Sequence, residues 1–195
     1  MITLCMDTSH IFLVLGLIRD GEVIASVQEK CWKRQSEEFF PKLTAMCEAA
    51  GITPDGIDAL VISRGPGSYT GVRIAMTAAK VFCTMKDRPL YTLSTLQLYA
   101  GKESGRVLLD ARGGRAYTCA YENGVPTEAE SVRSVTEIDA DTDIIGDGHL
   151  VSKEDRWPDI VKNFCLLQEQ WQLSENAHLV VPEYLKPSDA YMVKK

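Results

Sequence analysis

Apolar residues form alternating or continuous runs through the first thirty positions of the chain. Residues 2–7, 11–20 and 22–30 are three such segments, separated by the short polar stretches 8–10 and 20–21. The second stretch is Asp-Gly, which is typical of the turn in a β-hairpin. The pattern therefore predicts a meander of three antiparallel strands.

The apolar period becomes helical after residue 35. Apolar side chains recur on one face of the segment 36–51, which predicts an amphipathic helix capped by Ser36 and ended by Gly51. Pro41 inside this segment predicts a kink or a later start. After a buried strand at 57–64, the segment 71–85 predicts a second helix that is apolar on nearly every side, so something must enclose it.

A pattern of strands begins again after the linker candidate Gly-Lys-Glu-Ser-Gly at 101–105. An Asp ends a strand in each half, in "CMDTS" and in "LLDARGG", which predicts two similar α/β lobes with mixed sheets. We expect an N-terminal lobe over 1–100 and a shortened C-terminal lobe over 104–195. The strands expected in the second half are 106–112, 115–124, 130–138 and 143–148, followed by one helix around 159–173.

Composition narrows the class of protein. The chain has 195 residues, of which 45% are hydrophobic and 25% charged, as in ordinary globular proteins. Its formal net charge of -6 argues against unaided binding of nucleic acid, because phosphates reward clustered Lys and Arg. The six cysteines show no CxxC pair, and we find no signal peptide or membrane span. These features predict a cytoplasmic protein with reduced thiols.

Two strand ends offer candidate nucleotide chemistry. Asp7 is followed by Thr8 and Ser9, and Asp110 precedes Gly113 and Gly114. Facing each other across two lobes, such turns could hold a nucleotide phosphate and a magnesium ion. The positive charge of Arg112, two residues after Asp110, would repel a cation bound there. The alternative is that each Asp only caps its own turn.

The stretch "GPGSYTGVR", residues 65–73, has two interpretations. Gly67 is expected to supply a positive φ in a type II turn, and Thr70 to cap the helix that begins at Gly71. The amides of residues 71–73 could then face an anion, or the loop could only position the helix. The loop lacks the lysine of a P-loop.

Other catalytic arrangements are not evident. The three histidines, His10, His149 and His178, do not have the spacing that places two ligands on one helical face. Ser68 does not lie in a G-x-S-x-G elbow. The sequence therefore predicts no catalytic residue and no metal site.

Several motifs together resemble the TsaB family, also called YeaZ. These are "DTS", "QSEEFFPKL", "ISRGPGSYTGVRIA", "LLDARGGRAY" and "PEYLKP", and the match covers about residues 1–125 and 181–188. The resemblance implies the two-lobed ASKHA fold of actin-like and sugar-kinase-like proteins. It also implies a non-catalytic subunit that supports the metalloenzyme TsaD in threonylcarbamoyl transfer to adenosine 37 of tRNA. The paired H-x-x-x-H histidines of TsaD are absent from residues 98–106.

The resemblance further implies the partners. The two predicted helices, at 36–50 and 72–85, would form a homodimer and contact a TsaD-like subunit, with core packing as the alternative for their apolar faces. A TsaE-like ATPase would join the complex, tRNA would be contacted only indirectly, and no membrane would be involved. The chain would hold no cofactor alone, and ATP and magnesium would act only in the complex. The expected interface residues are Phe39, Phe40, Leu43, Met46, Cys47, Ile74, Ala75, Ala78 and Val81.

Two other functions stay open. One is an ATP-dependent phosphotransferase or ATPase that uses Asp7, Thr8, Ser9 and the turn at 113–114. The other is a zinc-type peptidase, for which the sequence shows no ligand set.

Overall fold

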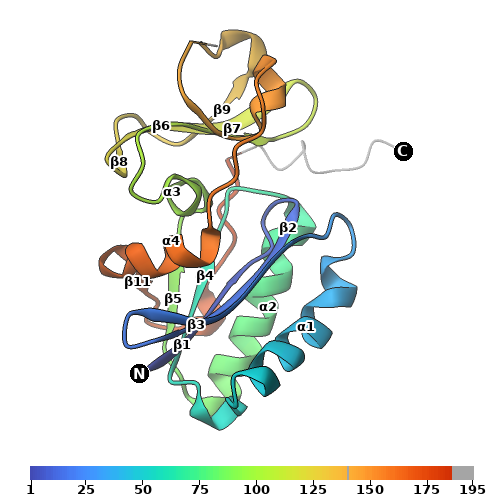
Figure 1. The fold of residues 1–195 in the computed structure, drawn as a ribbon, viewed down its shortest axis with the longest axis vertical. Coiled ribbons are helices and arrows are strands. Elements are labelled where there is room, and N and C mark those ends of the chain that lie inside the picture. Colours follow the sequence, from blue (N-terminus) through green and yellow to red (C-terminus); the bar gives the residue numbers. More distant parts are fainter. Residues whose placement is uncertain (140, 186–195) are drawn as a thin grey trace.

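The first of two β-sheets is built mainly from the N-terminal half of the chain (Figure 1). The computed structural model describes residues 1–139 and 141–185. The strands of this sheet are β1 (Ile2–Asp7), β2 (Phe12–Arg19), β3 (Glu22–Lys30), β4 (Ala59–Ser63), β5 (Leu90–Leu93) and β11 (Gln172–Leu173). Their order is β11-β5-β4-β1-β2-β3, with β1, β2 and β3 antiparallel and β1, β4 and β5 parallel. The predicted meander is confirmed.

The second sheet repeats this arrangement on a smaller scale. Its strands are β6 (Gly105–Asp110), β7 (Arg115–Glu122), β8 (Val125–Pro126), β9 (Ser131–Ser134) and β10 (Ile144–Gly146). Strand β6 pairs antiparallel with β7 and parallel with β10, just as β1 pairs with β2 and β4. The predicted α/β class with mixed sheets is therefore confirmed.

Helices cover both faces of the first sheet. Helices α1 (Gln35–Ala49) and α2 (Tyr69–Lys86) lie side by side on one face, and α3 (Thr95–Ala100) and α4 (Ile160–Leu166) lie on the other (Figure 1). Every residue of β2 except Arg19 is buried, which explains its unbroken apolar run. Within the described residues, none of the helices has the length and apolarity needed to cross a membrane.

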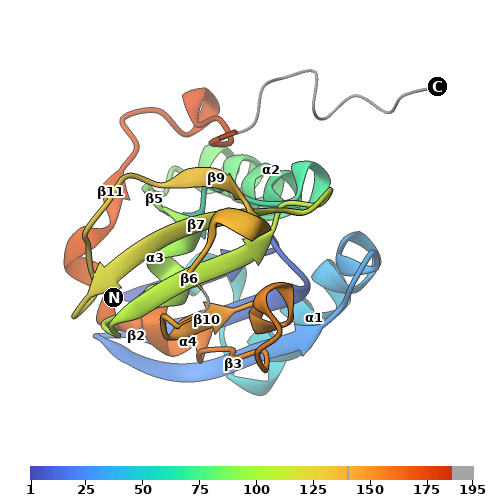
Figure 2. The same cartoon turned by 90° about the horizontal axis from the view of Figure 1, so that it is seen from above.

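Two apolar clusters lie on opposite faces of the first sheet. Leu13 and Leu15 of β2 pack in the cluster beneath α1 and α2. Phe12 and Val14, which point the other way, pack in a second cluster that includes Tyr117 of the second sheet. The second cluster therefore joins the two sheets, whose strands lie one above the other in Figure 2.

The chain returns to the first sheet after residue 157. Ile160, Val161 and Phe164 of α4 are buried against the first sheet, and β11 extends that sheet beyond β5. The side chain of Gln28 in β3 holds this return, because it donates to the carbonyl oxygen of Pro158 and accepts from the amide of Ile160, both at 2.8 Å. The expected lobe 104–195 assigns this segment to the second sheet. The structure places it on the first, where it covers apolar residues of β2.

Helix α1 begins earlier than predicted. It starts at Gln35 with Arg34 as the N-cap residue, so Ser36 is not its cap. Pro41 lies inside the helix, and the predicted later start is wrong. The amide that Pro41 lacks would have bonded the carbonyl of Glu37, an exposed residue that water can satisfy.

Candidate functional site

An apolar groove of about 1010 Å³ runs between α1 and α2. Phe40, Leu43 and Cys47 of α1 line one side, and Ala78 and Val81 of α2 line the other. Phe40 is 63% exposed and Val81 53% exposed, which is unusual for large apolar side chains. A contiguous apolar groove of this kind is typical of a surface that binds another molecule.

The expected interface residues divide into two sets. Phe39, Met46 and Ala75 are buried in the core beneath the helices, so they pack within the chain, although Phe39 also borders the groove. The other expected residues are half-buried or exposed and line the groove, namely Phe40, Leu43, Cys47, Ile74, Ala78 and Val81. Met85, which is 75% exposed, also lines it and was missed. The spacing from Ile74 through Ala78 and Val81 leads to it, since residue 85 continues the same helical stripe.

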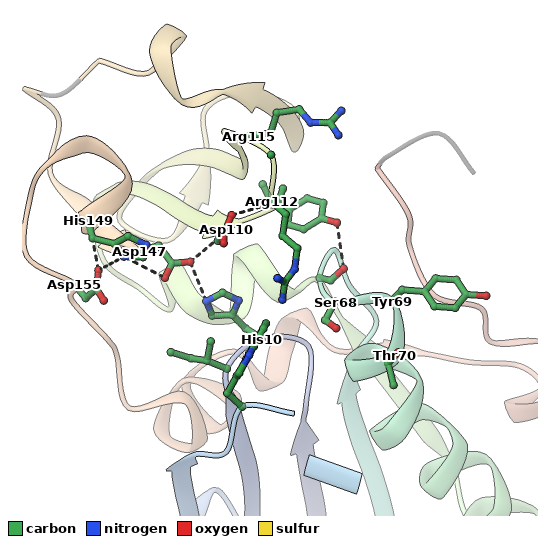
Figure 3. A pocket seen from close by; sticks show the side chains of 16 residues that line it. His10, Ser68, Tyr69, Thr70, Asp110, Arg112, Arg115, Asp147, His149 and Asp155 are labelled. Carbon is green, nitrogen blue, oxygen red and sulfur yellow. Dashed lines mark hydrogen bonds and ion pairs between the residues drawn. The ribbon is translucent and has the colours of Figure 1, made fainter. Parts of the chain in front are cut away.

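A second cavity, of about 630 Å³, lies between the sheets (Figure 3). The start of α2, at Ser68 to Thr70, forms one wall. Asp110, the last residue of β6, and Arg112 form another, and His10, Asp147 and His149 also line the cavity. The guanidinium of Arg112 stacks on Trp32 at 4.7 Å from the ring centroid. We call this cavity the cleft.

The residues expected to touch a nucleotide at the end of β1 are held inside the protein. Asp7, fully buried, accepts hydrogen bonds from the amide of Ser9 at 3.0 Å and from the hydroxyl of Ser63. The hydroxyl of Thr8 donates to the carbonyl of Gly71 at 2.6 Å. Asp7, Thr8 and Ser9 do not line the cleft. They tie β1 to its neighbours.

The matching turn after β6 is more open. Asp110 and Gly113 line the cleft, whereas Gly114 does not. The carboxylate of Asp110 accepts from the amide of Arg112 at 2.7 Å, two residues on, as Asp7 does from Ser9. Each strand-end Asp therefore caps its own turn, as the alternative interpretation predicts.

The amides at the start of α2 have partners within the helix. The cap is Ser68 rather than the predicted Thr70, and its side chain accepts from the amide of Gly71 at 3.3 Å. The amide of Val72 donates to the carbonyl of Ser68 at 3.0 Å. Two of the three amides expected to face an anion are thus bonded to the cap.

The glycines of this loop allow close packing. The positive φ lies at Gly65, at 109°, and not at Gly67 as predicted. A Cβ atom on Gly67 would collide with the carbonyl of Ser9, and one on Gly71 with that of Thr8. The loop therefore holds α2 tightly against the turn between β1 and β2.

Four titratable side chains that the sequence did not connect meet at one side of the cleft (Figure 3). Nδ1 of His149 lies 2.8 Å from Oδ1 of Asp155 and 3.8 Å from Oδ1 of Asp147. Nε2 of His10 lies 2.9 Å from Oδ2 of Asp147. The hydrogen bond to Asp155 raises the pKa of His149. Asp147, His149 and Asp155 have the atoms and spacing to hold a metal ion.

Sequence spacing did not reveal this cluster because its members come from separate elements. His10 lies between β1 and β2, and the others follow β10. The search for histidines with helical spacing can find only ligands that lie on the same element. The available signal was "GDGH" at 146–149, which places an Asp and a His directly after a buried strand.

Comparison with known proteins gives one family and several relatives. The family model of TsaD, tRNA N6-adenosine threonylcarbamoyltransferase, matches residues 23–145. TsaB, a tRNA threonylcarbamoyladenosine biosynthesis protein, is 33% identical in Bacillus subtilis over 129 residues and in Escherichia coli over 132. Each alignment covers 63% of this chain. The chain spans 56% of the first relative and 57% of the second.

Solved structures agree on the fold. YeaZ from Pseudomonas aeruginosa superposes with a TM-score of 0.74 at 23% identity, covering 94% of this chain and 99% of that one. A second structure from the same organism, described as an uncharacterized protein similar to the peptidase YeaZ, gives a TM-score of 0.77 at 23% identity. It covers 95% of this chain and 99% of that chain. The superpositions confirm the expected α/β fold, with two mixed sheets flanked by helices.

Proposed function

This chain belongs to the TsaB (YeaZ) branch of the TsaD family, and from that premise we propose that it serves tRNA threonylcarbamoyladenosine biosynthesis as a scaffold. It acts in the cytoplasm, without catalysis of its own, beside a TsaD-like metalloenzyme. That enzyme transfers the threonylcarbamoyl group to adenosine 37. Membership of the family supports a part in this pathway. The apolar groove and the buried residues at the end of β1 support the part of a scaffold without catalysis.

The groove between α1 and α2 is the observation that carries this proposal. Its walls are apolar, and the large side chains of Phe40, Val81 and Met85 are exposed to water. Burying such side chains stabilises an association by roughly 1.5–3 kcal/mol each when burial is complete. Two copies facing each other would pair α1 and α2 into a four-helix interface. The TsaD-like subunit docks on this same face.

The interior of the chain supports a role without catalysis. Asp7 and Thr8, which a phosphotransferase would turn toward a nucleotide, are buried and bonded within the protein. In this proposal, ATP and magnesium act only in the complex, and a TsaE-like ATPase is a further subunit. The net charge of -6 fits a subunit that meets tRNA only through its partners.

The dimer is tested by placing a charge in the groove. We expect Val81→Glu to convert a dimer into a folded monomer, because the introduced carboxylate would have to be desolvated in the interface. Light scattering after size exclusion measures the mass, and circular dichroism checks the fold. Val125→Glu is the control, since Val125 is 61% exposed on β8 and lies outside the groove. Phe39 is unsuitable for this test because it is core.

Two results would contradict the proposal. The first is a wild-type chain that is monomeric at every concentration and does not bind a TsaD-like subunit. The second is formation of the modified nucleoside, measured by mass spectrometry, at an equal rate with and without this chain. Micromolar binding of ATP and magnesium with turnover by the isolated chain would favour the phosphotransferase.

A further inference from the structure

We propose that Asp147, His149 and Asp155 bind a divalent first-row transition metal ion, with Zn²⁺ as the representative, and that His10 orients Asp147. The site lies beside the cleft, away from the groove between α1 and α2. It is independent of the scaffold function proposed above. It replaces the sequence prediction that the chain has no metal site.

The spacing of the donor atoms fits such an ion. In a tetrahedral site with bonds of about 2.1 Å, neighbouring ligand atoms lie roughly 3.4 Å apart. Nδ1 of His149 lies 2.8 Å from the Asp155 oxygen and 3.8 Å from the nearer Asp147 oxygen. These two distances bracket the expected spacing, and the ligand atoms of all three residues lie within 4.8 Å of one another, close enough to surround one ion after small side-chain adjustments.

His10 gives a second, independent indication. Its side chain is 7% exposed, and its Nε2 atom lies 2.9 Å from Oδ2 of Asp147 without making a hydrogen bond to any described residue. A buried ring nitrogen with no hydrogen bond is costly. Figure 3 shows this ring directed at Asp147 from the turn between β1 and β2. With Asp147 binding an ion through Oδ1, its Oδ2 stays beside Nε2 of His10, which would orient the carboxylate.

No lysine or arginine of the described residues pairs directly with either carboxylate. Within that part of the chain, Asp147 and Asp155 form ion pairs only with histidines. Arg156, the nearest arginine in sequence, instead pairs with Glu103 and donates to the carbonyl of Ile144. A carboxylate that is 4% exposed, as Asp147 is, calls for a compensating positive charge.

The backbone already holds the ligands in place. The amide of His149 donates to Asp155 at 3.1 Å, and the amide of Asp110 donates to Oδ2 of Asp147 at 2.6 Å. Oδ1 of Asp147 therefore stays directed toward His149. Imidazole with carboxylate oxygen favours Zn²⁺, Mn²⁺ or Co²⁺ over Ca²⁺, which prefers oxygen ligands alone. The side chain of His149 is 58% exposed and lines the cleft, so the site is accessible to an ion from solvent.

Metal titration of the full-length chain tests the site. After dialysis against a chelator, we expect Zn²⁺ to bind at one equivalent per chain in calorimetry. Co²⁺ should then show visible d–d absorption without the near-ultraviolet band of thiolate ligation. That spectrum separates this site from the six free cysteines. A thiolate band with every bound ion, or no binding by either metal, would overturn the proposal.

Matched variants identify the ligands. His149→Ala and Asp155→Asn change accessible side chains, so the fold should survive, and each should weaken Zn²⁺ binding at least tenfold. His178→Ala removes a histidine whose ring contacts Thr84, outside the site, and should leave binding unchanged. Circular dichroism checks each fold. If His178→Ala weakens binding as much as His149→Ala does, or if neither ligand variant weakens it, the assignment is wrong.

Discussion

At the scale of single residues, the loop at 65–73 shows how one amino acid can serve a different purpose from the predicted one. The sequence indicated that Gly67 supplies a positive φ, but the structure gives that conformation to Gly65. Gly67 and Gly71 are instead glycines because two backbone carbonyls approach them. The sequence shows that this loop is rich in glycine, but only the packing of the neighbouring turn shows what each glycine is needed for.

The close approach at Gly71 yields a stability prediction. A Cβ atom there would collide with the carbonyl of Thr8, which is backbone and cannot rotate away. We expect Gly71→Ala to lower the free energy of unfolding by about 3 kcal/mol. Gly56→Ala, where an added Cβ meets nothing closer than 3.9 Å, should stay within about 0.5 kcal/mol. Urea denaturation followed by fluorescence measures both changes, and equal effects would contradict the packing argument.

A half-buried carboxyl, that of Glu130, predicts a pH dependence. Burial raises the pKa of Glu130, so the stability it contributes is full below the pKa of the unfolded chain and is lost as the pH rises through the folded value. Glu130→Gln, which can still accept from Ser94, should therefore raise the melting temperature at pH 7 and leave it almost unchanged near pH 4. Calorimetry at both pH values measures this.

Glu128 provides the control with the opposite sign. Burial alone would raise its pKa, but Arg106 and Arg133 bind its carboxylate and lower it. Its stabilisation is present above the unfolded pKa and lost as the pH falls through the folded one. Glu128→Gln should then lower the melting temperature at pH 7. If both variants shift in the same direction, local charge does not set the pH dependence.

At the scale of elements, β2 is apolar throughout because both of its faces are buried. Helix α4 packs against one of these faces. The apolar run of β2 indicates a buried strand, but periodicity cannot say which elements cover it. Helix α4 comes from more than 140 residues later in the chain and packs there. Gly16 in β2 is a glycine because Val161 of α4 occupies the space of a side chain.

The contribution of α4 can be measured with two neighbouring positions. Phe164 is fully buried, and Leu166 on the same helix is 46% exposed. Phe164→Ala should lower the free energy of unfolding by about 3–5 kcal/mol, because it leaves a cavity at the junction of helix and sheet. Leu166→Ala should cost less than about 1 kcal/mol. Equal losses in chemical denaturation would show that α4 is not part of the core.

At the scale of the whole molecule, the two sheets share one apolar cluster. Phe12 and Val14 from the first sheet, Tyr117 and Cys119 from the second, and Phe164 from α4 belong to it. The hydroxyl of Tyr117 also donates to the carbonyl of Gly67 at 3.2 Å across the cleft. The lobes are therefore coupled in stability, although each has its own sheet.

Shared packing predicts a single unfolding transition. Separating the sheets would expose side chains that are now fully buried, so neither is expected to unfold alone. We expect one calorimetric peak whose van't Hoff and calorimetric enthalpies agree, measured on the Val81→Glu monomer so that dissociation does not contribute. Two resolved peaks, or near- and far-ultraviolet transitions at different temperatures, would contradict this coupling.

The sequence alone determined the local elements and the family. Alternation, helical period and Asp-Gly fixed the meander, the two long helices and the repeated strand pattern, because each depends on residues close together in the chain. Motifs such as "GPGSYTGVR" identified the TsaB relationship for the same reason.

Only the tertiary structure decided which apolar residues are core and which titratable groups meet. Phe39 is buried and Phe40, its neighbour in the predicted stripe, is exposed. The apolar period could not predict this, because it does not contain the angle at which α1 lies on the sheet. The tertiary structure also brought His10 to Asp147 across 137 positions of sequence. Such contacts depend on how distant elements pack, and a pattern read along the chain does not contain that information.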